Sequence, residues 1–330
     1  MKSTTESLAR SITRKSSKLT YWVARLLVDK DLVNDFFRAY AYFRWADDII
    51  DAPITKEDDT TRRACLLFVE QQKELINRFY RGERPENLTP EECILADLIS
   101  NDQGENSGLQ SFIRNMFAVI EFDAHRRGRL ISQDELTWYS EALSKSVTNG
   151  LQYFIGNDHS YPDNDYRFLA AKAAHIAHLL RDVYQDNDDG FINIPREFLE
   201  EHEISPQDVH SLPFRNWVRE RVDLARRYFC EGKLYLESLE VLRCKIAGYW
   251  YCARFEGVLD DLDGNGYTLR TEYGSWYKFR MSASIVRLCL SVTIKHLTQM
   301  IFRDTKRVET KITSQKCDEE QEQNIQSLRI

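Results

Sequence analysis

The stretch YAYFRWADDIID, residues 40–51, carries most of the information about this fold. If this stretch is helical, its residues share one face of the helix with earlier ones. Steps of three and four residues place Val33, Phe37, Tyr40, Arg44, Asp47 and Asp51 on that face. The N-terminal half of the row is apolar and aromatic, and the C-terminal half is ionic. Unpaired buried charge is expensive, so this row predicts an oily pocket with an anionic mouth. The alternative is a solvated helix end in which Asp47, Asp48 and Asp51 have Arg44 as an intrahelical partner.

A second acidic segment, HIAHLLRDVYQD at residues 175–186, repeats this arrangement. Asp182 and Asp186 are four residues apart, and His175 and His178 extend their row toward the N-terminus. Two facing helices would bring both acidic pairs around one cavity, as happens in metal-binding helical bundles. Because carboxylate oxygens are hard ligands, we expect the two pairs to hold Mg²⁺, with Mn²⁺ as an alternative.

The side chains beside these carboxylates indicate the ligand. Phe, Tyr, Ile and Ala would line a cavity above a metal that favours phosphate oxygens. An apolar tunnel closed by a Mg²⁺-diphosphate clamp describes a site for prenyl diphosphates. The metal would favour departure of diphosphate, and an aromatic wall would exclude water and stabilise an allylic cation.

The rest of the chain predicts one all-α domain. Gly (13) and Pro (7) are scarce among the 330 residues, which favours long helices and few turns. Apolar residues at three- and four-residue spacing predict helices over 31–52, 57–81, 90–102, 108–128, 133–155, 164–187, 214–240, 242–263 and 275–304. Ser132 with Glu135 predicts a capping box, and Ser205-Pro206 predicts another helix start. We expect a flexible N-terminus over residues 1–15, a domain over 16–304 and a polar, disordered tail over 305–330.

Composition excludes several classes of protein. A net charge of −7 without a basic run predicts no nucleic-acid partner. Seven cysteines without a C-x-x-C pair predict reduced thiols in a cytoplasmic protein. No apolar run is long enough to cross a membrane. The apolar segment 275–304 is expected to be core, with peripheral membrane contact for product release as the alternative. No pattern predicts an oligomeric state.

Taken together, the motifs resemble the squalene/phytoene synthase family. The resemblance covers roughly residues 16 to 280, and its elements are SKLTYW (17–22), YAYFRWADDIID (40–51), FDAHRR (122–127), WYSEALSKSV (138–147), LLRDVYQDNDDGFINIPREF (179–198) and FEGVLDDLDGNGY (255–267). It implies a single-domain isoprenoid synthase helical bundle with a central apolar cavity. It also implies Mg²⁺-dependent, head-to-head condensation of two C15 or C20 prenyl diphosphates, through a cyclopropylcarbinyl diphosphate, to a squalene-, dehydrosqualene- or phytoene-type product. Reduction of that intermediate would need NADPH; the chain has no Gly-x-Gly-x-x-Gly fingerprint, but the family reduces without one.

The resemblance also implies roles for individual residues. Asp47, Asp51, Asp182 and Asp186 would hold Mg²⁺. The remaining implied substrate-site positions are Arg44, Arg181, Lys18 and Asp48 near the diphosphate, Phe37 and Tyr40 along the chain pocket, and Asp123 and Tyr139 in the central cavity.

The sequence departs from the family mainly at one pair of residues. His175 and His178 stand where Gln-x-x-Asn is usual, Gln185 replaces a Glu, and Phe255 replaces a Tyr. The two histidines are interpreted in three ways: as metal ligands, His178 above all; as a base that takes a proton from a carbocation; or as polar fillers that donate hydrogen bonds. Two other functions therefore stay open. One is a terpene synthase-like enzyme that ionises a single prenyl diphosphate, and the other is a non-catalytic relative on the same fold.

Overall fold

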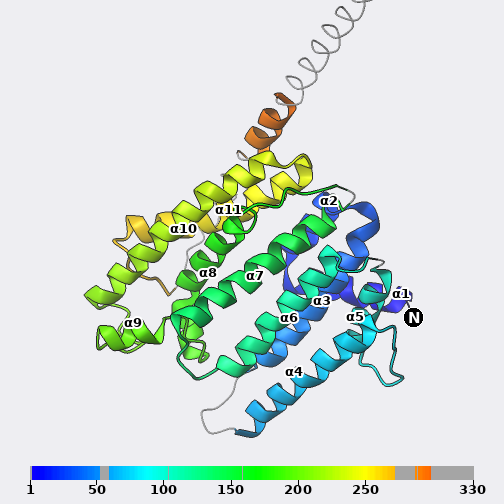
Figure 1. Ribbon diagram of the computed structural model, residues 1–330, viewed down its shortest axis with the longest axis horizontal. Helices are drawn as coiled ribbons and strands as arrows, with labels where there is room; N and C mark the ends of the chain where they lie inside the picture. Colours follow the sequence, from blue (N-terminus) through cyan, green and yellow to red (C-terminus); the bar gives the residue numbers. More distant parts are fainter. Residues whose placement is uncertain are drawn as a thin grey trace, which may run out of the picture.

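The computed structural model describes residues 2–52, 59–102, 104–157, 159–271, 287 and 289–298. Eleven α-helices and one 3-10 helix follow one another in this part of the chain (Figure 1). They are α1 (Lys2–Ser16), α2 (Lys18–Leu27), η1 (Lys30–Leu32), α3 (Val33–Ile50), α4 (Asp59–Tyr80), α5 (Pro90–Asn101), α6 (Gly108–Arg126), α7 (Gln133–Phe154), α8 (Leu169–Asp188), α9 (Arg196–Glu201), α10 (Leu212–Ser238) and α11 (Leu242–Gly264). Residues 289–298 are also helical. The described residues contain no strand, only an isolated bridge between Ile131 and Pro195.

Side-chain caps explain where several helices begin. The Ser132 hydroxyl accepts a hydrogen bond from the Glu135 amide, and the Glu135 carboxylate accepts one from the Ser132 amide, so the capping box predicted for α7 is confirmed. The helix start predicted at Ser205-Pro206 is wrong. Ser205 instead closes a turn with Asp208, and α10 begins after Ser211, which is the residue that caps it.

Four helices surround the centre of the molecule. In Figure 1, α3, α6, α7 and α8 lie in the middle, with α4 and α5 along one side and α10 and α11 along the other. A close backbone contact joins α10 to α8. A Cβ on Gly232 would lie 2.4 Å from the backbone nitrogen of Ala170, so only glycine permits this backbone contact. The contact fixes the N-terminal half of α8 against the outer layer.

The N-terminal residues are ordered by tertiary contacts. Residues 1–15 are expected to be flexible from their polar composition, whereas α1 packs against α3 and α5 and buries Ala9 and Thr13 completely. Thr5 donates a hydrogen bond of 2.7 Å to Asp97 on α5. These partners are distant in sequence, which is why local composition misses them. The predicted tail, 305–330, lies outside the described residues.

The C-terminal helix differs from the expectation of a buried core segment. Among residues 289–298, Val292 is buried, whereas Leu290, Ile294 and Leu297 are exposed. Most of the other residues between 275 and 304 lie outside the described residues. No helix in the described ranges has both the length and the apolarity needed to span a bilayer.

Candidate active site

A cavity of about 610 Å³ lies between the four central helices. Its deep end is apolar and aromatic, and the side chains there come from α3, α6 and α7: Phe36, Ala39, Phe43, Phe112, Met116, Leu143, Val147, Leu151 and Phe154. Its other end is lined by carboxylates and cations. The volume is typical of a site for a small organic ligand. The cavity therefore has the apolar wall and anionic mouth that the sequence predicts.

Helix α3 supplies one acidic side of this mouth. Tyr40, Arg44, Asp47 and Asp51 all line the cavity, as their common row predicts. The position predicted for Phe37 is wrong, since Phe37 is buried on the other side of α3 and stacks on Tyr21 of α2 at 5.4 Å between ring centroids.

Phe36 lines the cavity in place of Phe37. Phe36 lies four residues before Tyr40, so it lies on the same face of α3 as Tyr40.

Two implied substrate-site residues lie outside the cavity lining. Asp48 is exposed and forms an ion pair with Arg44, so the solvated-helix-end interpretation is right for this residue. Arg44 also approaches Asp47, with 3.5 Å between nitrogen and oxygen. Lys18 is exposed at the start of α2 and is not among the residues that line the cavity.

Helix α8 supplies the opposite side of the mouth, but only one of its two aspartates, Asp186, lines the cavity. His175, His178 and Asp186 line the cavity, whereas Asp182 is turned toward its own helix neighbours. Two nitrogens of Arg181 donate to the Asp182 oxygens at 2.7 and 2.6 Å, and His178 Nε2 lies 2.8 Å from one of them. His175 is buried, and its Nδ1 lies 3.1 Å from the Ser140 hydroxyl.

Sequence reasoning missed the network that joins the centre of the cavity to Asp186. Arg126 Nε donates to Asp123 at 2.5 Å, and Tyr139 donates to the second oxygen of Asp123 at 3.1 Å. Arg126 Nη1 also donates to Asn193 at 2.8 Å, and Asn193 Nδ2 donates to Asp186 at 2.8 Å. The segments FDAHRR and GFINIP contain Arg126 and Asn193, but only the fold brings them together. The network orients both carboxylates.

A neighbouring arginine ties the two acidic helices together from outside the cavity. Arg127 Nη1 donates to the carbonyl oxygens of Ile50 and Ala52, at 2.6 and 2.9 Å, at the end of α3. Arg127 Nε donates to the Asp189 carbonyl at 3.0 Å, directly after α8. A cation at a helix C-terminus satisfies unpaired carbonyls and the helix dipole. Arg127 therefore fixes the distance between the two acidic helix ends.

The carboxylates at the mouth carry more negative charge than their surroundings compensate. Burial, followed by the charge of Asp51, raises the pKa of Asp47 to about 7. Burial and the charge of Asp182 likewise raise the pKa of Asp186 to about 7. The charge of Asp123 raises both values, which places Asp123 between the two acidic helices. Asp182 differs: burial opposes its ionisation, but hydrogen bonds from Arg181 and His178 together hold its pKa below the usual range.

By their chemistry these residues suit a hard divalent cation, but among the described residues no three of their ligand atoms lie within 4.8 Å of one another. Asp47, Asp51, Asp123 and Asp186 offer carboxylate oxygens, the ligand type that Mg²⁺ and Mn²⁺ prefer. Burial first, and the charge of a neighbouring aspartate second, raise the pKa values of Asp47 and Asp186, and a bound cation would favour the charged form of both. His178 is the weakest candidate ligand, because its Nε2 already faces Asp182.

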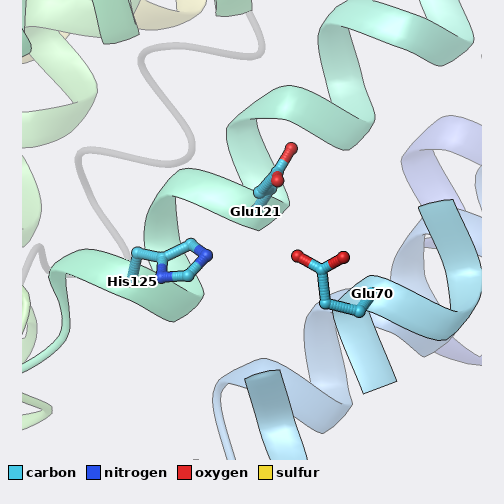
Figure 2. A group of neighbouring side chains, drawn as sticks. All are labelled: Glu70, Glu121 and His125. Carbon is cyan, nitrogen blue, oxygen red and sulfur yellow. The ribbon is translucent and has the colours of Figure 1, made fainter. Parts of the chain in front are cut away.

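A second cluster of ligand-type side chains lies elsewhere, between α4 and α6. Figure 2 shows Glu70 of α4 opposite Glu121 and His125 of α6, and one ligand atom from each lies within 4.8 Å of the others. Glu70 and His125 are exposed, and Lys73 donates to Glu121 at 2.6 Å. Because the Lys73 ammonium is already paired with the Glu121 carboxylate, we interpret the cluster as a group of surface ion pairs.

Comparison with known proteins bears directly on the site. The family model for squalene/phytoene synthase matches residues 13–280. The chain belongs to the squalene/phytoene synthase family. Its similarity to a 15-cis-phytoene synthase from Synechocystis is 24% identity over 278 residues, which cover 79% of this chain and 77% of the relative.

Two solved structures confirm the fold class expected for this family. The squalene synthase HpnC from Alicyclobacillus acidocaldarius superposes with a TM-score of 0.62 and 20% identity, covering 81% of this chain and 95% of that one. A dehydrosqualene synthase in complex with ligand superposes with a TM-score of 0.62 and 17% identity. The match covers 87% of this chain and 97% of that one. The all-α bundle of a squalene/phytoene synthase is therefore the architecture that positions this site.

Proposed function

We propose that this protein joins two prenyl diphosphates head-to-head in a Mg²⁺-dependent reaction that releases diphosphate. One observation carries the proposal: acidic side chains from α3, α6 and α8 ring the mouth of a 610 Å³ cavity whose deep end is apolar and aromatic. The family assignment supports it, because it makes a prenyltransferase-type enzyme the expected activity.

The residues of the mouth would act on the leaving group. Asp47, Asp51 and Asp186 are the side chains that would hold Mg²⁺, which when bound would neutralise the departing diphosphate. Arg44 and Arg126, which also line the cavity, would add positive charge near the same oxygens. Asp123 and Asn193 would hold Arg126 in place by accepting its hydrogen bonds, and Tyr139 would hold Asp123 by donating to it.

The deep end would control the carbocation. When the C–O bond breaks, its electron pair leaves with diphosphate, and the allylic carbon becomes positive. Phe36, Phe43 and Phe112 present apolar surface that excludes water, and their ring faces attract a cation. Burial, aided by the charge of His178, holds the pKa of His175 well below its usual range, so this ring stays neutral and offers a hydrogen-bonding group at the cavity wall. His175 Nδ1 lies within hydrogen-bond distance of the Ser140 hydroxyl. We therefore propose that His175 fills space and forms hydrogen bonds, and does not act as a base.

The test is incubation of the full chain with labelled farnesyl or geranylgeranyl diphosphate, followed by identification of extractable lipids. Parallel reactions contain EDTA, EDTA with excess Mg²⁺ or Mn²⁺, Zn²⁺ alone, and Mg²⁺ with NADPH. We expect diphosphate release and a C30 or C40 hydrocarbon with Mg²⁺ or Mn²⁺, and none with EDTA or with Zn²⁺ alone. The arm with NADPH reports whether the product is reduced.

Three results would contradict all or part of the proposal. A product with the carbon number of a single substrate would show a terpene synthase-like reaction that ionises one prenyl diphosphate. Intact substrate under every condition, from protein that unfolds cooperatively, would show a non-catalytic relative. Turnover that persists in excess EDTA would refute the metal dependence alone.

A further inference from the structure

Helix α2 presents an apolar stripe to solvent. Leu19, Trp22 and Leu26 follow one another at three- and four-residue spacing, and they are 40%, 57% and 65% exposed. The opposite face holds α2 on the protein, since Ala24 and Leu27 are buried there. Leu67 on α4 and Leu234 on α10 are exposed singly, whereas Leu290, Ile294 and Leu297 form a second exposed apolar row in the helix over 289–298, which lacks a tryptophan. A stripe that contains a tryptophan marks an interaction surface more often than a scattered residue does.

The charges around the stripe have one sign. Residues 7–28 contain five basic residues and no acidic residue, in a chain whose net charge is −7; the five are Arg10, Arg14, Lys15, Lys18 and Arg25. Lys18 and Arg25 are seven residues apart on α2, so they follow one edge of the stripe, and both are exposed. An apolar stripe edged by bases is typical of helices that lie on anionic membranes.

The stripe also lies beside the cavity wall. Ser17, the N-cap of α2, is within hydrogen-bond reach of Tyr40, which lines the cavity. Tyr21 of α2 stacks on Phe37, the neighbour of the cavity residue Phe36. Helix α2 therefore packs on α3, the helix that supplies part of the cavity wall.

We propose that α2 docks the protein on the surface of an anionic phospholipid bilayer. Trp22 and Leu26 enter the boundary between headgroups and acyl chains, where an indole ring is favourably placed, while Lys18 and Arg25 contact lipid phosphates. A second copy of this chain is the less favourable occupant, because apposed copies of the basic segment would repel each other. The proposal stands apart from the proposed enzymatic function, because it concerns binding to lipid alone.

The test is co-sedimentation of the purified full chain with vesicles. One set contains phosphatidylcholine only, and the other contains about one third phosphatidylglycerol. We expect the partition coefficient of the parent to be about tenfold or more higher on anionic vesicles at low salt, and to fall as salt is added. The double variant Trp22→Ser/Leu26→Ser should lose about tenfold or more of this binding. Lys18→Gln/Arg25→Gln should reduce binding to anionic vesicles to nearly that on neutral vesicles.

The matched control is Leu67→Ser/Leu234→Ser, which removes two equally exposed leucines elsewhere and should bind as the parent does. All variants change exposed side chains, so their unfolding midpoints should match the parent. The proposal is overturned if the parent binds anionic vesicles at low salt no more tightly than neutral ones. It is also overturned if the Trp22/Leu26 variant binds anionic vesicles as tightly as the parent. It is also overturned if sedimentation without lipid reveals a dimer that this variant dissociates, because a second copy would then be the occupant.

Discussion

Neutralising one aspartate on each acidic helix, Asp47 on α3 and Asp182 on α8, should change the stability of the metal-free protein in opposite directions. Asp47→Asn removes a charge that burial and Asp51 disfavour, so the folded state gains stability at pH 8. Asp182→Asn removes the negative charge and one of the two oxygens that accept from Arg181 and face His178, so the folded state loses stability. Turnover should fall by about 10² or more in Asp47→Asn, because this variant loses a charge near the leaving group.

The magnitudes follow from the pKa shifts and contacts. Raising the pKa of Asp47 from 3.8 to about 7 corresponds to about 4 kcal/mol without solvent screening. The Asp47 side chain is 47% exposed, so screening reduces this to about 1–2 kcal/mol, or a rise in Tm of about 2–5 °C. Loss of the charged hydrogen bonds at Asp182 should cost about 1–3 kcal/mol, with a corresponding fall in Tm.

The pH dependence gives an independent check of sign. The folded pKa of Asp47 is raised, so between the unfolded value of 3.8 and about 7 the native state binds more protons, and stability falls as pH rises. The advantage of Asp47→Asn should therefore shrink as pH falls below about 7. The folded pKa of Asp182 is lowered, so its contribution is present above the unfolded value and is complete at pH 8.

The assay is thermal or urea unfolding in EDTA at pH 5.5, 7 and 8, with the parent and both variants in parallel. Asp48→Asn is the matched control, because Asp48 is exposed and lies outside the cavity. Equal shifts in the same direction for Asp47→Asn and Asp182→Asn would refute the reasoning. So would a stabilisation by Asp47→Asn that does not depend on pH.

Three further predictions concern the cavity and its supports. A Cβ at Gly150 would lie 2.8 Å from the Phe112 ring, so Gly150→Ala should push this ring into the cavity and lower the ratio of kcat/KM for C20 over C15 substrate about tenfold, measured by competition. Arg127→Gln loses the contacts that join the two acidic helix ends, so half-maximal turnover should need several-fold more Mg²⁺, with partial rescue by Arg127→Lys. His175→Gln/His178→Asn should keep the main product in a product analysis by mass spectrometry, because amides replace ring nitrogens as hydrogen-bonding groups.

Each of these predictions has a contradicting outcome. The cavity prediction is contradicted if Gly150→Ala leaves the ratio of kcat/KM for C20 over C15 substrate unchanged. The control is Gly264→Ala, because a Cβ at Gly264 meets nothing within 4 Å. For Arg127→Gln, it is a lower maximal rate with an unchanged Mg²⁺ requirement, which would indicate only general damage to the fold. For the histidines, it is a switch to a different hydrocarbon, which would identify a base acting on the carbocation.

The helical rows could be predicted from the sequence because their signals are local. Spacing alone places Tyr40, Arg44, Asp47 and Asp51 on one side of α3, and all four line the cavity. The same spacing does not decide between Phe36 and Phe37, because either continues the row. Packing of α2 against α3 decides it by covering Phe37, and this contact spans 16 residues of sequence.

The parts of the site that sequence reasoning missed depend on longer-range contacts. Arg126 meets Asn193 across 67 positions in the chain, so no motif spacing joins them. Asp182 was expected at the mouth because it shares a row with Asp186. Its pairing with Arg181 and His178 takes it out of the cavity lining, and such side-chain competition is visible only once rotamers are placed.

The contact between Gly232 and Ala170 has a consequence for mutational scans of this protein. Any side chain at Gly232 would push the N-terminal half of α8 away from α10. Ala170 and Asp186 are 16 residues apart on α8, or about 24 Å along the helix axis. A rigid helix carries a displacement at one end to the other, so a scan scored by product yield alone would rank Gly232 beside the acidic residues. Soluble yield would separate the two groups, since substitutions at Gly232 should lower it and Asp47→Asn should not.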